Sequence, residues 1–332
     1  MFSGTSYSFF SKKAIFVFIC SFWLASPAFA EKETAAVSEK CVQLTKDATT
    51  DLKEVIAAGC KPSQAQISKL MDNPVGNLAM IVMQEDYTLI KGPHSNGYRE
   101  VSRSQIIPTF PLALGQNWTL VNRVSIPYVG APLNNNLFQH DFLTNGRHQG
   151  DIFKRTKGLG DIVYVGLFAP SQSYKTQNGG IFVWGIGPTI SLPTASHEEL
   201  GWGKYAAGPT AVAAYLGKEW TLGLFPQHWW SFAGDKDRSH VNMTNIQYFI
   251  FKNLNEKWRI GMSPNITINW TADGGNKVTL PVGLGLSYTT EIAGIPVRMG
   301  AEVQYSVVRP SDHMGSRWNF RFVIVPVIPM FK

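Results

Sequence analysis

The stretch Trp258–Trp270, with the sequence WRIGMSPNITINW, constrains the fold more than any other part of the chain. Its even positions are apolar, its odd positions are polar or small, and the apolar set begins and ends with tryptophan. A strict period of two describes one β-strand with two unlike faces. A strand of this length, tilted by roughly 40°, spans about 25–30 Å, the height of the apolar band on a membrane barrel. We therefore predict that it crosses a bilayer as part of a closed barrel.

The same alternation recurs from residue 73 to the end of the chain, separated by turn residues. It predicts an all-β fold: a closed antiparallel transmembrane β-barrel of about twelve strands, preceded by a short N-terminal helical segment. The expected strands are about 78–90, 98–112, 117–130, 159–170, 180–193, 204–216, 219–231, 241–252, 257–270, 277–289, 295–308 and 317–331. Short connections fall mostly on one side of this sheet and long ones on the other, as in bacterial outer-membrane barrels.

Two aromatic pairs repeat the spacing of the opening strand. Trp118 and Tyr128 share one predicted strand face, as do Trp220 and Trp230. Amphipathic rings at both ends of a strand are typical of the two water–lipid boundaries. Prolines inside several predicted strands are the one feature against this pattern, because proline cannot donate to a β-ladder. We expect each of them to mark a bulge or a locally unpaired step.

Composition agrees with many strands joined by turns. The 332 residues include 30 glycines and 12% aromatic residues, whereas charged residues make up only 16%. The formal charge is +7, and it falls to +5 without Lys12 and Lys13. No run of Lys and Arg interleaves with aromatic residues, so we expect no nucleic-acid partner. We expect outer-membrane lipid and lipopolysaccharide as partners. The longest loop either contacts lipopolysaccharide phosphates or is an ordinary solvated loop, and its four basic residues are Arg147, Lys154, Arg155 and Lys157.

Residues 1–30 have the pattern of a secretory signal peptide. Lys12 and Lys13 precede the apolar run 14–25, and Ala28-Phe29-Ala30 forms a cleavage site. No other stretch approaches 18 apolar residues, so any membrane crossing must be made by strands. We predict export through a cleaved signal peptide and residence in the outer membrane of a Gram-negative bacterium.

Residues 31–72 are predicted to form a helical cap on the periplasmic side, before a barrel over residues 73–332. One helical face carries Leu44, Ala48, Leu52, Val55 and Ile56. Ser63 and Gln66 have the spacing of a capping box, which predicts a second helix. Cleavage leaves two cysteines, Cys41 and Cys60, and we expect a structural disulfide in the oxidising periplasm. A redox role would need a C-x-x-C pair, which the sequence lacks.

Several phrases resemble a family of bacterial outer-membrane proteins described as transporters of the phenol-degradation MetA-pathway type, some mislabelled neuromedin U. The phrases are NPVGNL (73–78), GLGDI (158–162), WGIGP (184–188), LPTA (192–195) and WSFAG (230–234). The resemblance implies an outer-membrane barrel that passes small apolar or aromatic molecules, with no catalytic residues and no cofactor. The segment 31–62 departs from the family pattern, and the chain ends Phe331-Lys332 rather than on an aromatic residue. We nevertheless expect the barrel-assembly machinery as a partner.

Polar residues on the predicted inner face are candidates to line a channel for a small-molecule solute. They are Arg123, Arg259, Asn265, Asn269, Arg298, Glu302, Gln304 and Arg321. Opposed arginine and glutamate side chains would set charge selectivity. The alternative is a plugged, salt-bridged interior that conducts nothing. Asp161 would lie at the mouth, where it binds a cation or solute or else accepts hydrogen bonds from backbone N–H groups.

The remaining candidates are weaker. The histidines lack the tight spacing of a metal site, so we predict no metal. We predict a non-enzyme. The alternatives are an outer-membrane lipid hydrolase, for which only His228 and Ser231 form a loosely comparable pair, and a structural or adhesive surface barrel. The spacing of His228 and Ser231 puts them on opposite strand faces, with no third group to orient them.

Overall fold

The structure, a computed structural model, describes residues 39–46, 50, 52–92, 97–132, 155–310, 312 and 314–328. The predicted signal peptide, residues 1–30, lies outside the described residues, as do residues 133–154 of the longest predicted loop. Arg147 and Lys154, two of the proposed lipopolysaccharide contacts, fall in that loop segment.

Strands make up most of the described chain, and the α-helices of the described residues all precede them. Residues 39–46 are helical. The elements that follow are α2 (Leu52–Ala57), α3 (Gln64–Asp72), β1 (Ala79–Lys91), β2 (Arg99–Leu114), β3 (Trp118–Ala131), β4 (Thr156–Leu159), β5 (Ile162–Pro170), β6 (Tyr174–Lys175), β7 (Ile181–Leu192), η1 (Glu198–Leu200), β8 (Lys204–Leu216), β9 (Trp220–Gly234), β10 (Asn242–Asn253), β11 (Trp258–Met262), β12 (Asn265–Asn269), η2 (Gly274–Asn276), β13 (Val278–Ile292), β14 (Ile295–Val308) and β15 (Gly315–Ile328).

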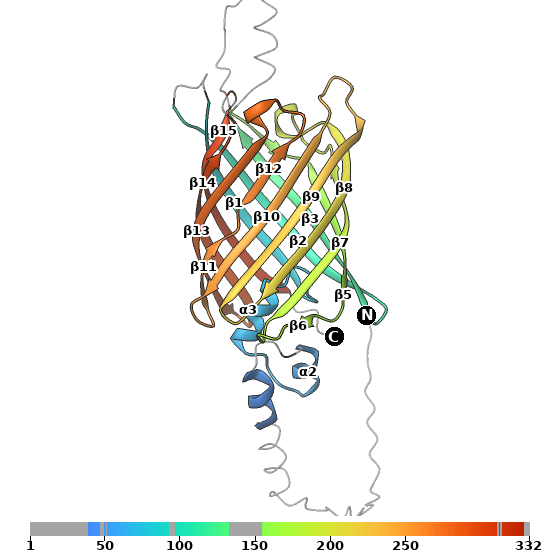
Figure 1. Cartoon of the computed structure of the whole chain (residues 1–332), viewed down its shortest axis with the longest axis vertical. Coiled ribbons are helices and arrows are strands. Elements are labelled where there is room, and N and C mark those ends of the chain that lie inside the picture. The colour runs from blue at the N-terminus through green and yellow to red at the C-terminus, as the bar shows by residue number, and fades with distance from the viewer. Residues whose placement is uncertain are drawn as a thin grey trace, which may run out of the picture.

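The strands form one closed antiparallel barrel. Successive wall strands pair with each other, and β1 pairs with β15 to close the ring. β4 with β5, and β11 with β12, each make up one wall strand, and the short β6 extends the hairpin to β7, so the barrel has 12 strands. Figure 1 shows the tilted strands as a single cylinder with α2 and α3 at one end. The predicted fold class is confirmed, and β8 and β14 match the predicted ranges 204–216 and 295–308.

The outward face of the barrel is apolar and carries aromatic residues toward both ends. Leu284 and Ile106 are among the exposed large side chains of its middle. Exposed aromatic residues lie near opposite ends of β3 (Trp118 and Tyr128) and of β9 (Trp220 and Trp230), and Trp258 at the start of β11 and Trp270 directly after β12 form a third exposed pair. An exposed apolar band between aromatic girdles is the surface that lipid hydrocarbon covers. The alternation of apolar and polar residues along the strands therefore arises because one face of the barrel wall is outward and apolar and the other lines the interior, as the sequence predicted.

The predicted strand 257–270 is not continuous, which corrects the expectation for this stretch. It divides into β11 and β12 at Ser263–Pro264, although both parts pair with β10 and β13. Pro264 has no N–H to give to the ladder, so the pairing stops there. The backbone N–H and carbonyl of Ser263 instead bond side chains inside the barrel. The register with β13 is the same on both sides of the break, so the apolar positions of β11 and β12 lie on the same face of the sheet.

Other prolines coincide with irregular steps in the sheet. The register between β13 and β14 shifts at Leu280/Pro281. Pro188 of β7 faces Pro209 of β8, and the registered pairs between β8 and β9 omit Pro209. Pro281 and Pro209 thus lie at the irregular or unpaired steps expected for proline in a strand. The expectation does not hold at every proline, because Pro226 pairs with Ile246 of β10 in an unshifted register.

The helical segment has the capping box and the disulfide that its sequence predicted, but the predicted first helix is divided into residues 39–46 and α2, with a bend at residue 50. Ser63 Oγ accepts a hydrogen bond from Gln66 N (3.3 Å), and Gln66 Oε1 accepts one from Ser63 N (3.0 Å), so the capping box opens α3. The Cys41–Cys60 disulfide is present, with the two Cα atoms 5.4 Å apart. Gln66 Nε2 also donates to Leu44 O (2.8 Å), which holds the first helical residues against α3. Within the described residues, no helix has the length and apolar character to span a membrane.

Candidate functional site

The interior of the barrel has an apolar side and a charged side. Inward residues of β3, β5, β7, β8 and β9 form one buried apolar cluster: Val121, Val165, Leu167, Ala169, Val183, Val212, Ala214, Leu216 and Phe225. Inward residues of β1, β14 and β15 are instead charged or polar. A solute inside the barrel would meet hydrocarbon on one side and fixed charges on the other.

Charges alternate in sign along the charged side. In the strand register, Asp86 of β1 lies opposite both Arg103 of β2 and Arg321 of β15, and Arg321 lies opposite Glu302 of β14. Arg321 Nε donates to Asp86 Oδ1 (2.8 Å), and Asn319 Nδ2 donates to the same oxygen (2.9 Å). Alternating signs in a poorly hydrated interior neutralise one another and hold each side chain in place.

The broken strand connects to this row of charges. Glu302 accepts hydrogen bonds from Ser263 N (2.9 Å) and Ser263 Oγ (3.0 Å), while Ser263 O accepts one from Arg321 Nη1 (2.7 Å). Gly285 lies opposite Glu302, and a Cβ at Gly285 would come within 2.7 Å of Glu302 Cβ. The glycine thus leaves room for Glu302 to cross β13 and reach the break at Ser263.

The last turn of α3 enters the charged side of the barrel. The Asp72 carboxylate forms ion pairs with Arg298 (Nη1–Oδ1 2.5 Å) and with Arg259, and it accepts a hydrogen bond from Thr221 Oγ1 (3.1 Å). Arg298 also donates to Ser68 O (2.8 Å) and is only 3% exposed. Two arginines of the predicted channel wall are therefore occupied by the helical segment.

The electrostatics of Asp72 favour its ionised form. Burial by itself would raise the pKa of this carboxyl group, but the charges of Arg259 and Arg298 and the hydrogen bonds from Arg298 and Thr221 oppose it. The pKa is held below its usual 3.8. The ion pairs are consequently intact at neutral pH.

The segment after α3 packs against the apolar side. Val75 belongs to the buried cluster, and Asn77 Oδ1 accepts a hydrogen bond from Thr119 Oγ1 of β3 (3.4 Å). On α3 itself, Lys69 Nζ donates to Gly217 O at the turn between β8 and β9. Contacts on both sides of the barrel hold α3 and residues 73–78 in its helix-bearing end. The sequence predicted a helical cap but did not show that α3 and residues 73–78 are inserted between the walls of the barrel.

The other predicted site residues lie apart from these ion pairs. Arg123, on β3, places its guanidinium 5.5 Å from the centre of the Phe225 ring. Asn265 lies on β12, and Asn269 Oδ1 accepts hydrogen bonds from Thr271 in the turn that follows. Gln304 donates to Glu302 Oε1 (2.9 Å). Asp161 accepts hydrogen bonds from the backbone N–H groups of Ala195 (3.1 Å) and Trp202 (2.5 Å), which fixes the loop between β7 and β8.

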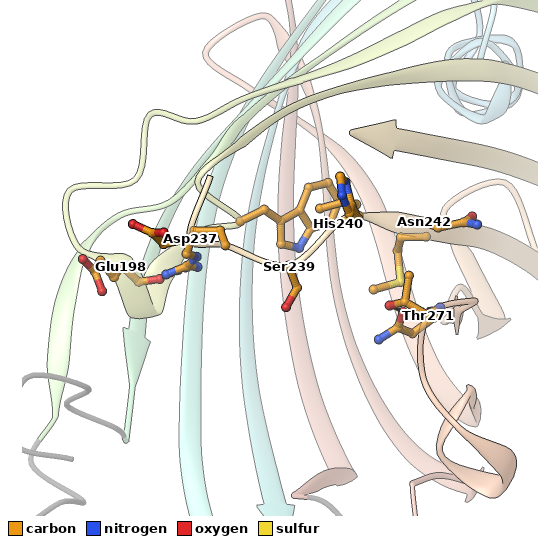
Figure 2. Close-up of a pocket in the computed structure, with 11 residues that line it drawn as sticks. Glu198, Asp237, Ser239, His240, Asn242 and Thr271 are labelled. Atoms are coloured by element: carbon orange, nitrogen blue, oxygen red, sulfur yellow. Dashed lines mark hydrogen bonds between the residues drawn. The ribbon is translucent and has the colours of Figure 1, made fainter. Parts of the chain in front are cut away.

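A pocket of about 430 Å³ lies at the mouth, the end of the barrel opposite α3. Figure 2 shows Glu198 and Asp237 on one side of it, Asn242 and Thr271 on the other, and Ser239 and His240 between them. Its walls come from η1, the loop between β9 and β10, and the turn after β12. Among the described residues, no group of three His, Cys, Asp or Glu is placed to hold a metal ion.

The two residues of the hydrolase alternative do not meet. His228 Nδ1 is 2.7 Å from Thr244 Oγ1, and Ser231 Oγ accepts a hydrogen bond from Val241 N (2.9 Å). Positions three apart on a strand lie on opposite faces. His228 packs against the exposed Trp230, so His228 lies on the outer face of the barrel and Ser231 on the inner face.

Sequence reasoning missed several of the residues that organise the interior. Asp86 could have been found, since it alternates with Gln84 and Thr88 on one face of β1. Asp72 could not, because it lies outside the strands and its partner Arg298 is 226 residues away in sequence. Arg155, a proposed lipopolysaccharide contact, pairs with Glu100 (3.1 Å) at the rim.

Comparisons with known proteins support the fold. No protein-family model matches the sequence, and no curated protein does. Among solved structures, the COG4313 outer membrane channel from Pseudomonas putida F1 matches with a TM-score of 0.51 and 12% identity, over 77% of this chain and 97% of that one. Outer membrane phospholipase A from Escherichia coli (12% identity, 81% and 99% covered) and the Pseudomonas putida toluene transporter TodX (9%, 78% and 93%) reach TM-scores of only 0.39 and 0.35.

Proposed function

We propose that this protein is an outer-membrane channel for small apolar or aromatic molecules, closed at its helix-bearing end by α3. The single observation that carries the proposal is a closed 12-stranded barrel whose two-sided interior is occupied by a segment held through Asp72. A barrel that served only as a scaffold would not require a buried charge on a helix to be matched by two wall arginines. Because isolated buried charges are costly, this pairing favours a defined closed state.

The remaining expectations from the sequence belong to this proposal. The five phrases that resemble transporters of the phenol-degradation type support membership of that family and the choice of solute. The short turns and the helical segment would face the periplasm, and the mouth would face outward. The chain would be exported with cleavage after Ala30, be assembled by the barrel-assembly machinery, and contact outer-membrane lipid and lipopolysaccharide.

Liposome swelling tests the proposal. Vesicles containing the purified mature chain are compared with empty vesicles across small sugars, benzyl alcohol glycosides and amino acids. Arg298→Ala removes the arginine that bonds both Asp72 and Ser68 of α3, so we expect swelling to rise several-fold over the parent. Glu302→Ala removes one interior negative charge and the acceptor of hydrogen bonds from Ser263 and Gln304, so we expect it to change the preference between charged solutes.

The matched control is Glu291→Gln. It removes an ion pair with Lys61 (3.2 Å) that also joins the helical segment to the barrel but lies near the surface, with side chains 79% and 28% exposed. Exposed pairs contribute only about 0–1 kcal/mol, so swelling should match the parent. Permeability equal to that of empty vesicles for every solute, in the parent and in Arg298→Ala alike, would rule out a channel.

A further inference from the structure

Arg123 points into the interior and is left out of the ion-pair network. Arg259 and Arg298 bond Asp72, and Arg321 bonds Asp86. Arg123 has no hydrogen bond or ion pair among the described residues, and its one recorded contact is the Phe225 ring. β3 and β9 are separated by β5, β7 and β8, so this contact runs through the interior. The guanidinium therefore lies inside the barrel with no paired counter-charge among the described residues.

A second unsatisfied group lies beside it. Thr109 of β2 is the residue directly opposite Arg123 in the β2–β3 register. Its hydroxyl is buried and has no hydrogen-bond partner among the described residues. A buried hydroxyl left unpaired costs free energy, as does a cation without a counter-charge. One ligand with acceptor oxygens would satisfy both groups.

The surroundings of these two groups are apolar. Val165 lies opposite Arg123 on the other neighbouring strand, β5, and both Val165 and Phe225 belong to the buried cluster. A cation and a hydroxyl at the edge of a hydrocarbon wall complement a ligand with one anionic end and one flat apolar end. A guanidinium matches the geometry of a carboxylate, and an aromatic ring packs well against phenylalanine.

Arg123 lies nearer the mouth than the inserted segment does. Thr119, which donates to Asn77 of the inserted segment, lies four residues before Arg123 on β3. At about 3.3 Å per residue, Arg123 is roughly 13 Å further along the strand toward the mouth. The site is thus on the mouth side of residues 73–78.

We propose that Arg123, Thr109 and Phe225 form a binding site for an aromatic carboxylate in the barrel interior. Arg123 and Thr109 donate hydrogen bonds to the carboxylate, and Phe225 with Val165 contacts the ring. This inference rests on the proposed channel function and specifies its solute as an aromatic monoanion rather than a neutral aromatic molecule.

Equilibrium dialysis of the purified full-length mature chain in detergent at pH 7.5 tests the site. The probes are 4-hydroxybenzoate, its neutral counterpart 4-hydroxybenzyl alcohol, and propionate, which has a carboxylate without a ring. We expect the parent to prefer 4-hydroxybenzoate to both. Arg123→Gln should weaken 4-hydroxybenzoate binding by about tenfold or more and leave the alcohol unchanged, since a hydrogen bond to a charged group is lost. Arg123→Lys should retain part of the preference.

Thr109→Val tests the contact with the carboxylate of the ligand, and Phe225→Leu tests the contact with its ring. Thr109→Val should weaken 4-hydroxybenzoate roughly three- to tenfold. Phe225→Leu should weaken both aromatic probes and not propionate. Thr210→Val is the matched control, because its buried hydroxyl already donates to Pro226 O (2.9 Å) and binding should not change. Heat-dependent electrophoretic mobility verifies that each variant forms a folded barrel.

Three results would overturn the site: equal affinity for 4-hydroxybenzoate and the alcohol, propionate binding as tightly as 4-hydroxybenzoate, or unchanged 4-hydroxybenzoate binding by folded Arg123→Gln. Liposome swelling distinguishes the two proposals. Swelling by other solutes without selective 4-hydroxybenzoate binding would contradict the site alone. Selective binding with no permeation by any solute would contradict the channel alone.

Discussion

Asp72 is the residue of α3 that forms ion pairs with two arginines of the barrel wall. Its carboxylate lies between Arg259 and Arg298, and its pKa is lowered because these charges outweigh the effect of burial. The other charges near it are Lys69 on α3 and Glu302, which acts on Arg259. Its folded-state pKa is below the unfolded value, so ionised Asp72 stabilises the docked segment above pH 3.8. That contribution is lost as the pH falls through the lowered folded-state pKa.

We predict that docking of α3 weakens only in strong acid. In proteoliposomes, limited proteolysis of the helical segment should be unchanged from pH 7 to about pH 4.5 and accelerate below the usual carboxyl pKa. Asp72→Asn should be susceptible at every pH in this range, with no acid transition. An acid transition of the same midpoint in Asp72→Asn would show that another group is responsible.

A glycine-to-alanine change in the charged side is also expected to be costly. At Gly285 an added Cβ would lie 2.5 Å from Ala301 O and 2.7 Å from Glu302 Cβ. We predict that Gly285→Ala destabilises the folded barrel by about 1–3 kcal/mol, measured by urea unfolding in lipid vesicles. Gly115→Ala is the comparison variant. An added Cβ at this turn glycine would meet open space, so its cost reports only the backbone strain of a φ of 70° and no steric contact. Stability equal to the parent in Gly285→Ala would contradict the proposed close approach.

At the scale of elements, α3 depends on its capping box and on the disulfide. Ser63 and Gln66 satisfy each other's backbone N–H groups at its start. We predict that Ser63→Ala costs the helix about 1 kcal/mol, seen as faster proteolysis of α3 in the intact barrel. Ser171→Ala, in a connection between strands, should leave that rate unchanged.

The disulfide is expected to stabilise the helical segment and not the barrel. Cys41 and Cys60 are 19 residues apart, and closing such a loop contributes about 3 kcal/mol in the chain-entropy model. The double variant Cys41→Ser, Cys60→Ser should lose protection of residues 39–60 in hydrogen exchange and keep that of the strands. Loss of protection in β1 or β15 as well would show that the segment is needed to close the barrel.

Strands were predictable from the sequence to within a few residues, whereas contacts inside the barrel were not. Alternation assigns each residue to a face because the wall has lipid on one side, and β8 and β14 follow from it without error. It does not identify partners, so Arg298 was assigned to the wall but its ion pair with Asp72 was not foreseen. Pro264 signalled an irregular step, but only the structure shows the strand broken there, with Ser263 bonded to Glu302.

At the scale of the whole molecule, the outer surface requires lipid. Leu284 is 63% exposed on β13, between the two aromatic girdles. We predict that Leu284→Arg destabilises the barrel in vesicles by about 2–4 kcal/mol, the cost of a cation near the middle of the bilayer. Ser316→Arg, near the mouth end of β15, should cost less than Leu284→Arg. Equal costs at the two positions, measured by urea unfolding, would contradict the proposed membrane position.

The central claim is that α3 closes a channel by pairing Asp72 with two arginines of the wall. Single-channel recording in planar bilayers at pH 7 tests it most directly, with Asp72→Asn compared with the parent and with Glu291→Gln. We predict rare, brief openings for the parent and for Glu291→Gln, and frequent, long openings for Asp72→Asn. Identical records from folded Asp72→Asn and the parent, whether both silent or both open, would contradict the claim.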